Sequence, residues 1–158
     1  MFRDIARFKQ KISEEACIEI LKAEKRGVLS VLGDDGYPYG MPLNHYYNEE
    51  DGHIYFHSGK KGHKIDAMKR CDKASFCVMD SGFLRSGEWA LNISSVIVFG
   101  RIRFVDDYDK VIDICRKLSY KFTDDDAYIE REIVRSGPGT LMFELVPEFV
   151  TGKLVNEA

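Results

Sequence analysis

Apolar and polar residues alternate along the first third of the chain in short runs separated by turns, which is typical of antiparallel strands. Val28–Leu32 predicts a first strand, and the Asp-Gly pair in Gly33–Gly36 predicts a hairpin turn. A second strand is expected from about Pro38 through Tyr47, an acidic turn at Asn48–Gly52, and a third strand at His53–His57. The short connections favour an antiparallel meander over β-α-β units.

The β pattern returns further along the chain, at Ala74–Met79, Ser94–Val105 and Thr140–Val146. Gly100 interrupts the longest of these runs and predicts a bulge where the strand bends. Pro147 is expected to end the last run, with Glu148–Val155 as a closing segment. Five or six antiparallel strands predict a small closed or partly closed barrel, because closure removes exposed edges.

Apolar residues at helical spacing predict four short helices between the strands: one from Ser13 to near Arg26, one at Ile65–Cys71, one after Asp106-Asp107, and one from Asp124 to about Val134. Gly27 is interpreted as the stop of the first helix, and Gly137–Gly139 as the break after the fourth. The segment Asp80–Leu91 is expected to be an irregular excursion in which Trp89, the only tryptophan, is a packing residue.

Composition narrows the class of protein. The 158 residues suit a single domain spanning 1–158, and 23 basic against 26 acidic residues give a net charge of −3, which does not indicate a nucleic-acid binder. The chain opens without an apolar signal segment and contains no membrane-length apolar run, so a cytoplasmic protein without membrane contact is expected. The four cysteines show no metal-ligand spacing and are interpreted as buried, reduced thiols. His45 and His53 have acidic neighbours, but alternate strands and turns scatter them, so no metal site is expected.

The stretch Ile54–Met68 gathers hydrogen-bond donors at the end of a strand. Ser58, the glycines Gly59 and Gly62, and three lysines (Lys60, Lys61 and Lys64) precede a predicted helix start. Such donors suit an anion, above all a phosphate. A solvated basic loop is the simpler alternative, in which Ser58 only caps the helix.

The order and spacing of several short blocks carry a resemblance that spans about Arg3 to Lys153. These blocks are Gly27–Val31, Asp35–Tyr39, Met41–Asn44, Ile54–Ser58, Gly62–Lys64, Ser95–Gly100 and Thr151–Lys153. Together they resemble the pyridoxamine 5′-phosphate oxidase-like FMN-binding split-barrel family, and within it the nitroimidazole-resistance branch. The resemblance implies an α+β fold, mainly an antiparallel split β-barrel of about six strands with peripheral short helices. It also implies a homodimer with two FMN sites at the interface.

Carried over to this chain, the resemblance assigns the cofactor residues. The flavin ring would lie along the stretch Pro42, Leu43 and Asn44. The phosphate or ribityl end of the cofactor would be held by His57, Ser58 and Lys64. Ser95 and Val96 would come from the partner protomer. No catalytic side chain is implied, because the flavin itself carries the redox step; His57 is a weak candidate.

The expected activity is that of an FMN-dependent oxidoreductase passing electrons from NAD(P)H or another donor to a small planar acceptor such as a nitroimidazole or nitroaromatic compound. The chain stops soon after Thr151–Lys153 and lacks the Arg-rich, Trp-containing region with which pyridoxamine phosphate oxidases hold their substrate, so that activity is not expected. Two alternatives stay open: a flavin- or haem-binding split-barrel protein without turnover, and use of a deazaflavin.

Overall fold

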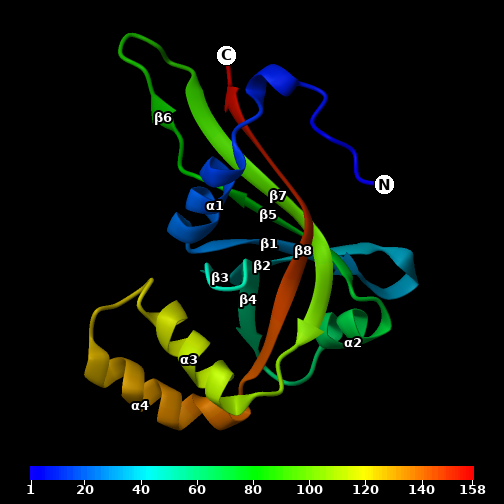
Figure 1. Cartoon of the computed structure of the whole chain (residues 1–158), viewed down its shortest axis with the longest axis vertical. Coiled ribbons are helices and arrows are strands. Elements are labelled where there is room, and N and C mark those ends of the chain that lie inside the picture. Colours follow the sequence, from blue (N-terminus) through cyan, green and yellow to red (C-terminus); the bar gives the residue numbers. More distant parts are fainter.

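One strongly curled antiparallel sheet forms most of the molecule (Figure 1). The computed structural model describes residues 1–158. Its strands are β1 (Arg26–Leu32), β2 (Pro38–Asn44), β3 (Tyr46–Asn48), β4 (His53–Ser58), β5 (Lys73–Met79), β6 (Phe83–Leu84), β7 (Leu91–Phe104) and β8 (Leu141–Asn156). They follow the order β2-β1-β5-β7-β8-β4-β3, with β6 paired to β7. All pairs are antiparallel, so the predicted α+β split barrel is confirmed.

The helices lie around the barrel, as Figure 1 shows: α3 and α4 pack together at one end, and α2 lies beside the β1–β2 hairpin. Their bounds are α1 (Glu14–Ala23), α2 (His63–Arg70), α3 (Tyr108–Ser119) and α4 (Asp126–Ser136), with 3-10 turns η1 (Phe8–Gln10), η2 (Asp34–Gly36) and η3 (Gly137–Gly139). Side chains cap three of the four α-helices: Ser13 accepts from the Ala16 N–H, Asp107 from Asp109, and Asp125 from Tyr128.

None of the helices has the length and apolar character that a membrane span needs.

The barrel core forms because β1, β5 and β7 bury every second side chain, whereas β4 and the first part of β8 bury consecutive ones. Leu29, Phe56, Phe76, Val98 and Phe143 are each fully buried in one continuous apolar cluster. A smaller cluster around Tyr55 joins β4 and β8 to α3. Burying this apolar surface supplies the main driving force for closing the sheet.

The last strand differs from its prediction. Pro147 does not end it, because β8 continues from Leu141 to Asn156 along the whole of β7. The register shifts between Phe99 and Gly100, so that Glu148 is the extra residue of a bulge and Pro147 lies opposite Gly100. A proline is tolerated at such an irregularity, because it lacks a ladder N–H where the ladder is interrupted. The bulge predicted at Gly100 is therefore confirmed.

Two other boundaries are corrected. The second predicted strand is divided at His45, which is completely buried; its Nε2 donates to the Leu21 carbonyl at 2.7 Å. Gly27 does not stop a helix but lies inside β1, where a Cβ atom would come within 2.5 Å of the Cys77 carbonyl oxygen. The glycine therefore permits close approach of β5.

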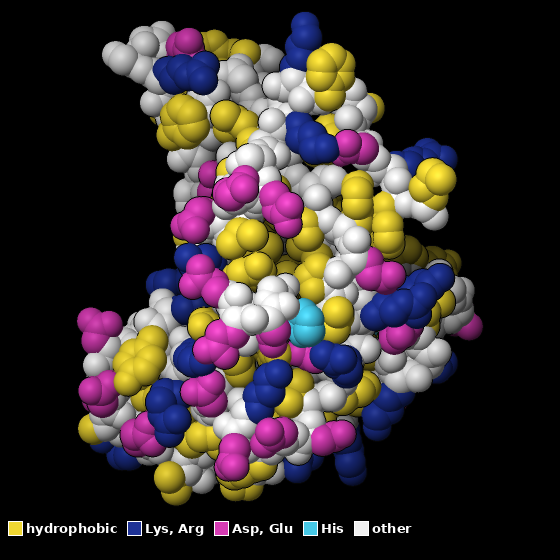
Figure 2. Space-filling view, viewed as in Figure 1, with side chains coloured by type: hydrophobic (Ala, Val, Ile, Leu, Met, Phe, Trp, Pro, Cys, Tyr) yellow, Lys and Arg dark blue, Asp and Glu magenta, His cyan; other side chains and the backbone are white.

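Trp89 was expected to pack, and this is wrong: its side chain is 80% exposed. It lies in a segment that projects with β6 and the start of β7 beyond the barrel (Figure 1). Phe83 and Leu84 of the same segment are exposed as well. Figure 2 shows hydrophobic side chains on this projection beside charged ones.

Candidate functional site

The loop after β4 holds main-chain donors that have no acceptor within the protein. None of the N–H groups of residues 59–64, here called the amide loop, donates a hydrogen bond to the chain. Gly62 is the N-cap of α2 and has φ +131°, a conformation that favours glycine, and no side chain caps the helix. Free N–H groups together with the positive end of a helix dipole form a site for an anion.

Side chains around the amide loop add positive charge. Lys64 lies in the first turn of α2, and Lys60 and Lys61 are exposed. Lys60 Nζ donates to the Pro138 carbonyl at 2.9 Å, and the Ser58 hydroxyl donates to the Gly59 carbonyl at 2.7 Å. Neither Lys61 nor Lys64 has an acidic partner, so both ammonium groups are available to a ligand.

The first turn of α2 is fixed against the β1–β2 hairpin. The His63 ring stacks on Tyr39 with ring centroids 4.1 Å apart, and its Nε2 accepts from the Asp34 N–H at 3.2 Å. Arg70 pairs with Asp34 at 3.0 Å from the last turn. His63 therefore positions the helix start.

His57 lies next to Ser58, but its side chain points to the other face of β4. It lines a cavity of about 250 Å³ with Cys115 and Ser119 of α3 and with residues of α4. Desolvation, and secondly the charge of Lys64, lower the pKa of the His57 imidazole. The ring is therefore neutral at pH 7.

The β2 residues from Pro42 to Asn44 lie on a free sheet edge. The strand order begins at β2, so the main-chain groups on the side away from β1 have no strand partner, and β4 approaches this side without pairing. Asn44 Oδ1 accepts from Arg26 Nε at 3.2 Å. Next to Pro42 is a cavity of about 540 Å³, lined by residues 23–28, Pro42, Cys77 and Met79.

The side of β1, β2, β5, β7 and β8 that points away from the core is here called the outer sheet face. Its best-defined row runs Pro42, Val28, Cys77, Ile97 and Thr151. Several of its large apolar side chains are exposed: Val28, Met79, Ile97 and Phe99. Ser95 lies on this face, whereas the Val96 side chain is fully buried in the core. An exposed apolar face of this extent is typical of an interaction surface.

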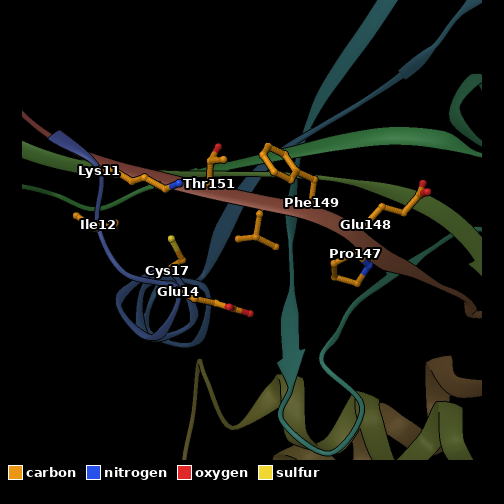
Figure 3. A pocket seen from close by; sticks show the side chains of 10 residues that line it. Lys11, Ile12, Glu14, Cys17, Pro147, Glu148, Phe149 and Thr151 are labelled. Carbon is orange, nitrogen blue, oxygen red and sulfur yellow. The ribbon is translucent and has the colours of Figure 1, made fainter. Parts of the chain in front are cut away.

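Another cavity, of about 490 Å³, lies between α1 and β8 (Figure 3). Lys11, Glu14 and Glu148 line it, and Cys17 lies at its base with 2% of its surface exposed. Burial, with the charge of Glu14, raises the pKa of the Cys17 thiol, so this cysteine is not a reactive nucleophile. All four cysteines are free; Cys77 is exposed, contrary to the expectation that they are buried.

A second polar group lies at the start of β4. Asp51, His53 and Glu144 bring their ligand-type atoms within 4.8 Å of one another. The buried Glu144 accepts from Arg103 Nε at 2.6 Å, and His53 Nδ1 lies 3.1 Å from its other oxygen. The Tyr55 hydroxyl donates to Asp51 at 2.5 Å. We call these five residues the Glu144 cluster; its carboxylates are already neutralised by protein donors.

Comparison with known proteins identifies the class of this barrel. The family model described as pyridoxamine 5′-phosphate oxidase matches residues 13–154, nearly the whole chain. The chain belongs to this family. This match confirms the resemblance noted in the sequence. The family is a split-barrel family with flavin-binding members. No curated protein matches the chain.

Solved structures share the fold of this family member. A candidate 5-nitroimidazole antibiotic resistance protein from Bacteroides thetaiotaomicron is 18% identical, with 92% of this chain and 87% of that chain covered and a TM-score of 0.75. An FAD-binding protein from Mesorhizobium loti is 24% identical, covering 92% and 97%, with a TM-score of 0.66. A flavocytochrome from Azotobacter vinelandii is 16% identical, covering 96% and 72%, with a TM-score of 0.76.

Sequence reasoning missed Arg26, which was assigned to the end of a helix. In this family member it lies at the start of β1, binds Asn44 and lines the cavity beside Pro42. The β1–β2 register pairs Arg26 with Asn44, and this was readable from the hairpin turn, whose position fixes which residues lie opposite.

Proposed function

We propose that the protein is an FMN-dependent oxidoreductase that reduces a small planar acceptor, such as a nitroaromatic compound, with electrons from NAD(P)H or another donor. The observation that carries this proposal is the amide loop. Its main-chain N–H groups have no acceptors, and it lies beside unpaired lysines and at the end of the free β2 edge. The family to which the chain belongs supplies the class of ligand.

The amide loop fits the phosphate of FMN. A phosphate monoester carries a charge of about −2 at neutral pH and has several strong acceptor oxygens. The N–H groups of residues 59–64 would donate to them, with Lys64 in the first turn of α2 as a cation and the Ser58 hydroxyl at the loop entrance. Gly62 gives the loop a turn that exposes these amides.

The free edge of β2 fits the flavin ring. The main-chain groups of Asn44 and the Pro42 carbonyl point away from β1 and offer hydrogen bonds to the polar edge of the ring. The main-chain groups of Leu43 face Gly27 of β1, so Leu43 would contribute through its side chain, and Pro42 offers an apolar contact. Arg26 holds the Asn44 side chain in place from β1. When bound, the flavin supplies the hydride or electron transfer, and the protein binds and orients it and restricts water.

The outer sheet face supports a homodimer, in which each flavin is enclosed by both protomers. The exposed apolar residues of this face would be buried against a second copy. Ser95 of the partner subunit would then reach the flavin through its hydroxyl. Because the Val96 side chain lies in the core, its contact would have to come from main-chain atoms.

The first experiment is titration of the apoprotein with FMN and with riboflavin, followed by flavin fluorescence. FMN is expected to bind more tightly, because riboflavin lacks the phosphate. Replacing Ser58 and Lys64 together by Ala should weaken FMN binding by about 30-fold, since it removes a charge and a hydroxyl donor from the phosphate. Riboflavin binding should not change.

Lys69→Ala is the matched control, because Lys69 is an exposed lysine of α2 away from the amide loop. A protein that binds neither flavin, or a double variant that binds FMN as tightly as the wild type, contradicts the proposal. Loss of a nitroimidazole in the presence of FMN and NADH then tests the reaction itself.

A haem-binding protein without turnover is the second candidate, because one structural neighbour is a flavocytochrome. Of the four histidines, only His57 has no hydrogen-bond partner within the chain, so it is the imidazole available as an axial ligand. A Soret band on addition of haem, abolished in His57→Ala, would favour this function. Flavin binding without such a band favours the first.

A further inference from the structure

A separate group of cations lies on the outer sheet face, away from the amide loop. Arg7 and Lys153 line a cavity of about 300 Å³ together with the hydroxyl residues Ser95 and Thr151. The remaining lining is small or apolar and consists of Ile5, Ala6, Ile97 and Gly152. We call this cavity the Lys153 pocket.

The Lys153 pocket contains positive charge without a compensating carboxylate. No acidic residue lines it, and neither Arg7 nor Lys153 makes a salt bridge. The neighbouring Lys11 differs, because it pairs with Asp4 at 2.6 Å. Two free cations and two hydroxyl groups around one cavity are complementary to an anion with several acceptor oxygens.

Pairing of β7 with β8 places these donors side by side. Ser95 lies opposite Lys153, and Ile97 lies opposite Thr151, so all four side chains are on the same face of adjacent strands. The register in this part of the sheet is continuous, because the bulge lies further along, at Gly100. The donors therefore rest on a rigid part of the barrel.

The N-terminal segment that carries Arg7 is held across the same strands. Phe2 stacks on Phe149 and Phe99, with ring centroids 5.3 and 5.5 Å away. The Ile12 N–H donates to the Gly152 carbonyl at 3.0 Å. Anchored on both sides, Arg7 is a fixed wall of the pocket and not part of a free tail.

We propose that the Lys153 pocket is a second phosphate subsite, which binds the phosphate of a phosphorylated small molecule through Arg7, Lys153 and the two hydroxyl groups. The identity of that molecule rests on the proposed function: it is the nicotinamide donor, because the single phosphate of FMN is already assigned to the amide loop and the donor carries a diphosphate. The pocket lies on the face that includes Ser95.

The test is a titration of the apoprotein with inorganic pyrophosphate, followed by amide chemical shifts in ¹⁵N-labelled protein. Saturable shifts are expected at Ser95, Thr151 and Gly152. In the Arg7→Met, Lys153→Met double variant, these shifts should require about tenfold more pyrophosphate, because two charge-assisted contacts are lost. Lys9→Met is the control, since Lys9 is an exposed lysine of the same segment outside the pocket.

The same spectra separate this inference from the proposed function. Shifts at residues 59–64 report on the amide loop, and shifts at residues 95, 151 and 152 report on the Lys153 pocket. No saturable shift at the second set, or equal shifts in the double variant, overturns the subsite even if the amide loop responds. Shifts at the second set alone keep the subsite and remove the support for the amide loop as a phosphate site.

Two further arms identify the source of the phosphate. The double variant is expected to raise the KM for NADH about tenfold with FMN affinity unchanged. A tenfold loss of FMN affinity would instead place the phosphate of the cofactor in the pocket and overturn the assignment to the donor. A double variant that changes neither value contradicts the assignment of the pocket to this reaction.

Discussion

The two ends of β4 carry polar groups that behave in opposite ways. At the His53 end, the Glu144 cluster pairs its carboxylates with Arg103, His53 and Tyr55. At the Ser58 end, the N–H groups of the amide loop have no acceptor, and Lys61 and Lys64 have no acidic partner. One strand thus connects a cluster whose polar groups pair with one another to a loop whose hydrogen-bond donors lack acceptors.

This difference separates a structural polar group from a binding site. In the Glu144 cluster, burial alone would raise the pKa of the Glu144 carboxyl, but its hydrogen bonds with Arg103 and His53 and the charge of Arg103 hold it below its usual value. The carboxylate is therefore charged and compensated, and it fastens β4 to β8. The amide loop has no internal compensation, so its donors are completed only by water or a ligand.

The largest expected effect comes from breaking the cluster. Glu144→Ala should lower the free energy of unfolding by about 3 kcal/mol, because it removes a buried, hydrogen-bonded carboxylate and leaves Arg103 and His53 without their acceptor. Urea denaturation measures this. FMN affinity of the folded variant should stay within about twofold of the wild type, since the amide loop is untouched.

Glu148→Ala is the matched control for that prediction, because Glu148 is on the same strand but exposed. The pH dependence of the free energy of unfolding gives a second test of the prediction for Glu144→Ala. Since the pKa of Glu144 is lowered on folding, its stabilisation is present above the ordinary glutamate pKa and is lost as pH falls through the lowered value. The variant should therefore lose less stability on acidification. An equal loss in both proteins would show that Glu144 is not compensated as described.

The sequence predicted those parts of the fold and site that depend on local signals. The β1–β2 hairpin, the helix caps at Ser13 and Asp107, and the donor-rich loop after Ser58 all follow from neighbouring residues. The errors at Pro147 and Trp89 have a different origin. Whether a proline ends a strand depends on the register of the facing strand, and whether a tryptophan packs depends on what covers it.

Contacts between residues far apart in the sequence could not be predicted for the same reason. The contact of His53 with Glu144 joins residues 91 positions apart, so the sequence showed only a histidine near acids. Burial of His45 likewise depends on α1 and on the α3 end, where Lys121 Nζ donates to the His45 carbonyl at 2.8 Å. Desolvation then lowers the pKa of the His45 imidazole to about 4.

A smaller effect is expected from Gly62→Ala at the other end of β4. No atom lies within 4 Å of a Cβ atom added there, so the cost comes from the backbone, whose φ of +131° an alanine rarely adopts. Stability should fall by about 2 kcal/mol, and FMN affinity should fall about tenfold as the amides turn away. Gly59→Ala is the control: it has equal space but no positive φ, and it should change stability by less than about 0.5 kcal/mol. Equal affinities in the two variants would contradict the role of the amide loop.

The smallest effect distinguishes two adjacent lysines by whether they already have a partner. Lys60 Nζ is held by the Pro138 carbonyl, whereas Lys61 has no acceptor in the chain. Lys61→Met should weaken FMN binding about threefold, because it removes a free charge close to the phosphate, and Lys60→Met should change it by less than about 1.5-fold. The difference should fade as salt is raised, since both side chains are exposed. A larger effect at Lys60 would mean that hydrogen bonds within the apoprotein do not predict which donors the ligand uses. The contrast between the two ends of β4 would then not distinguish a structural cluster from a binding site.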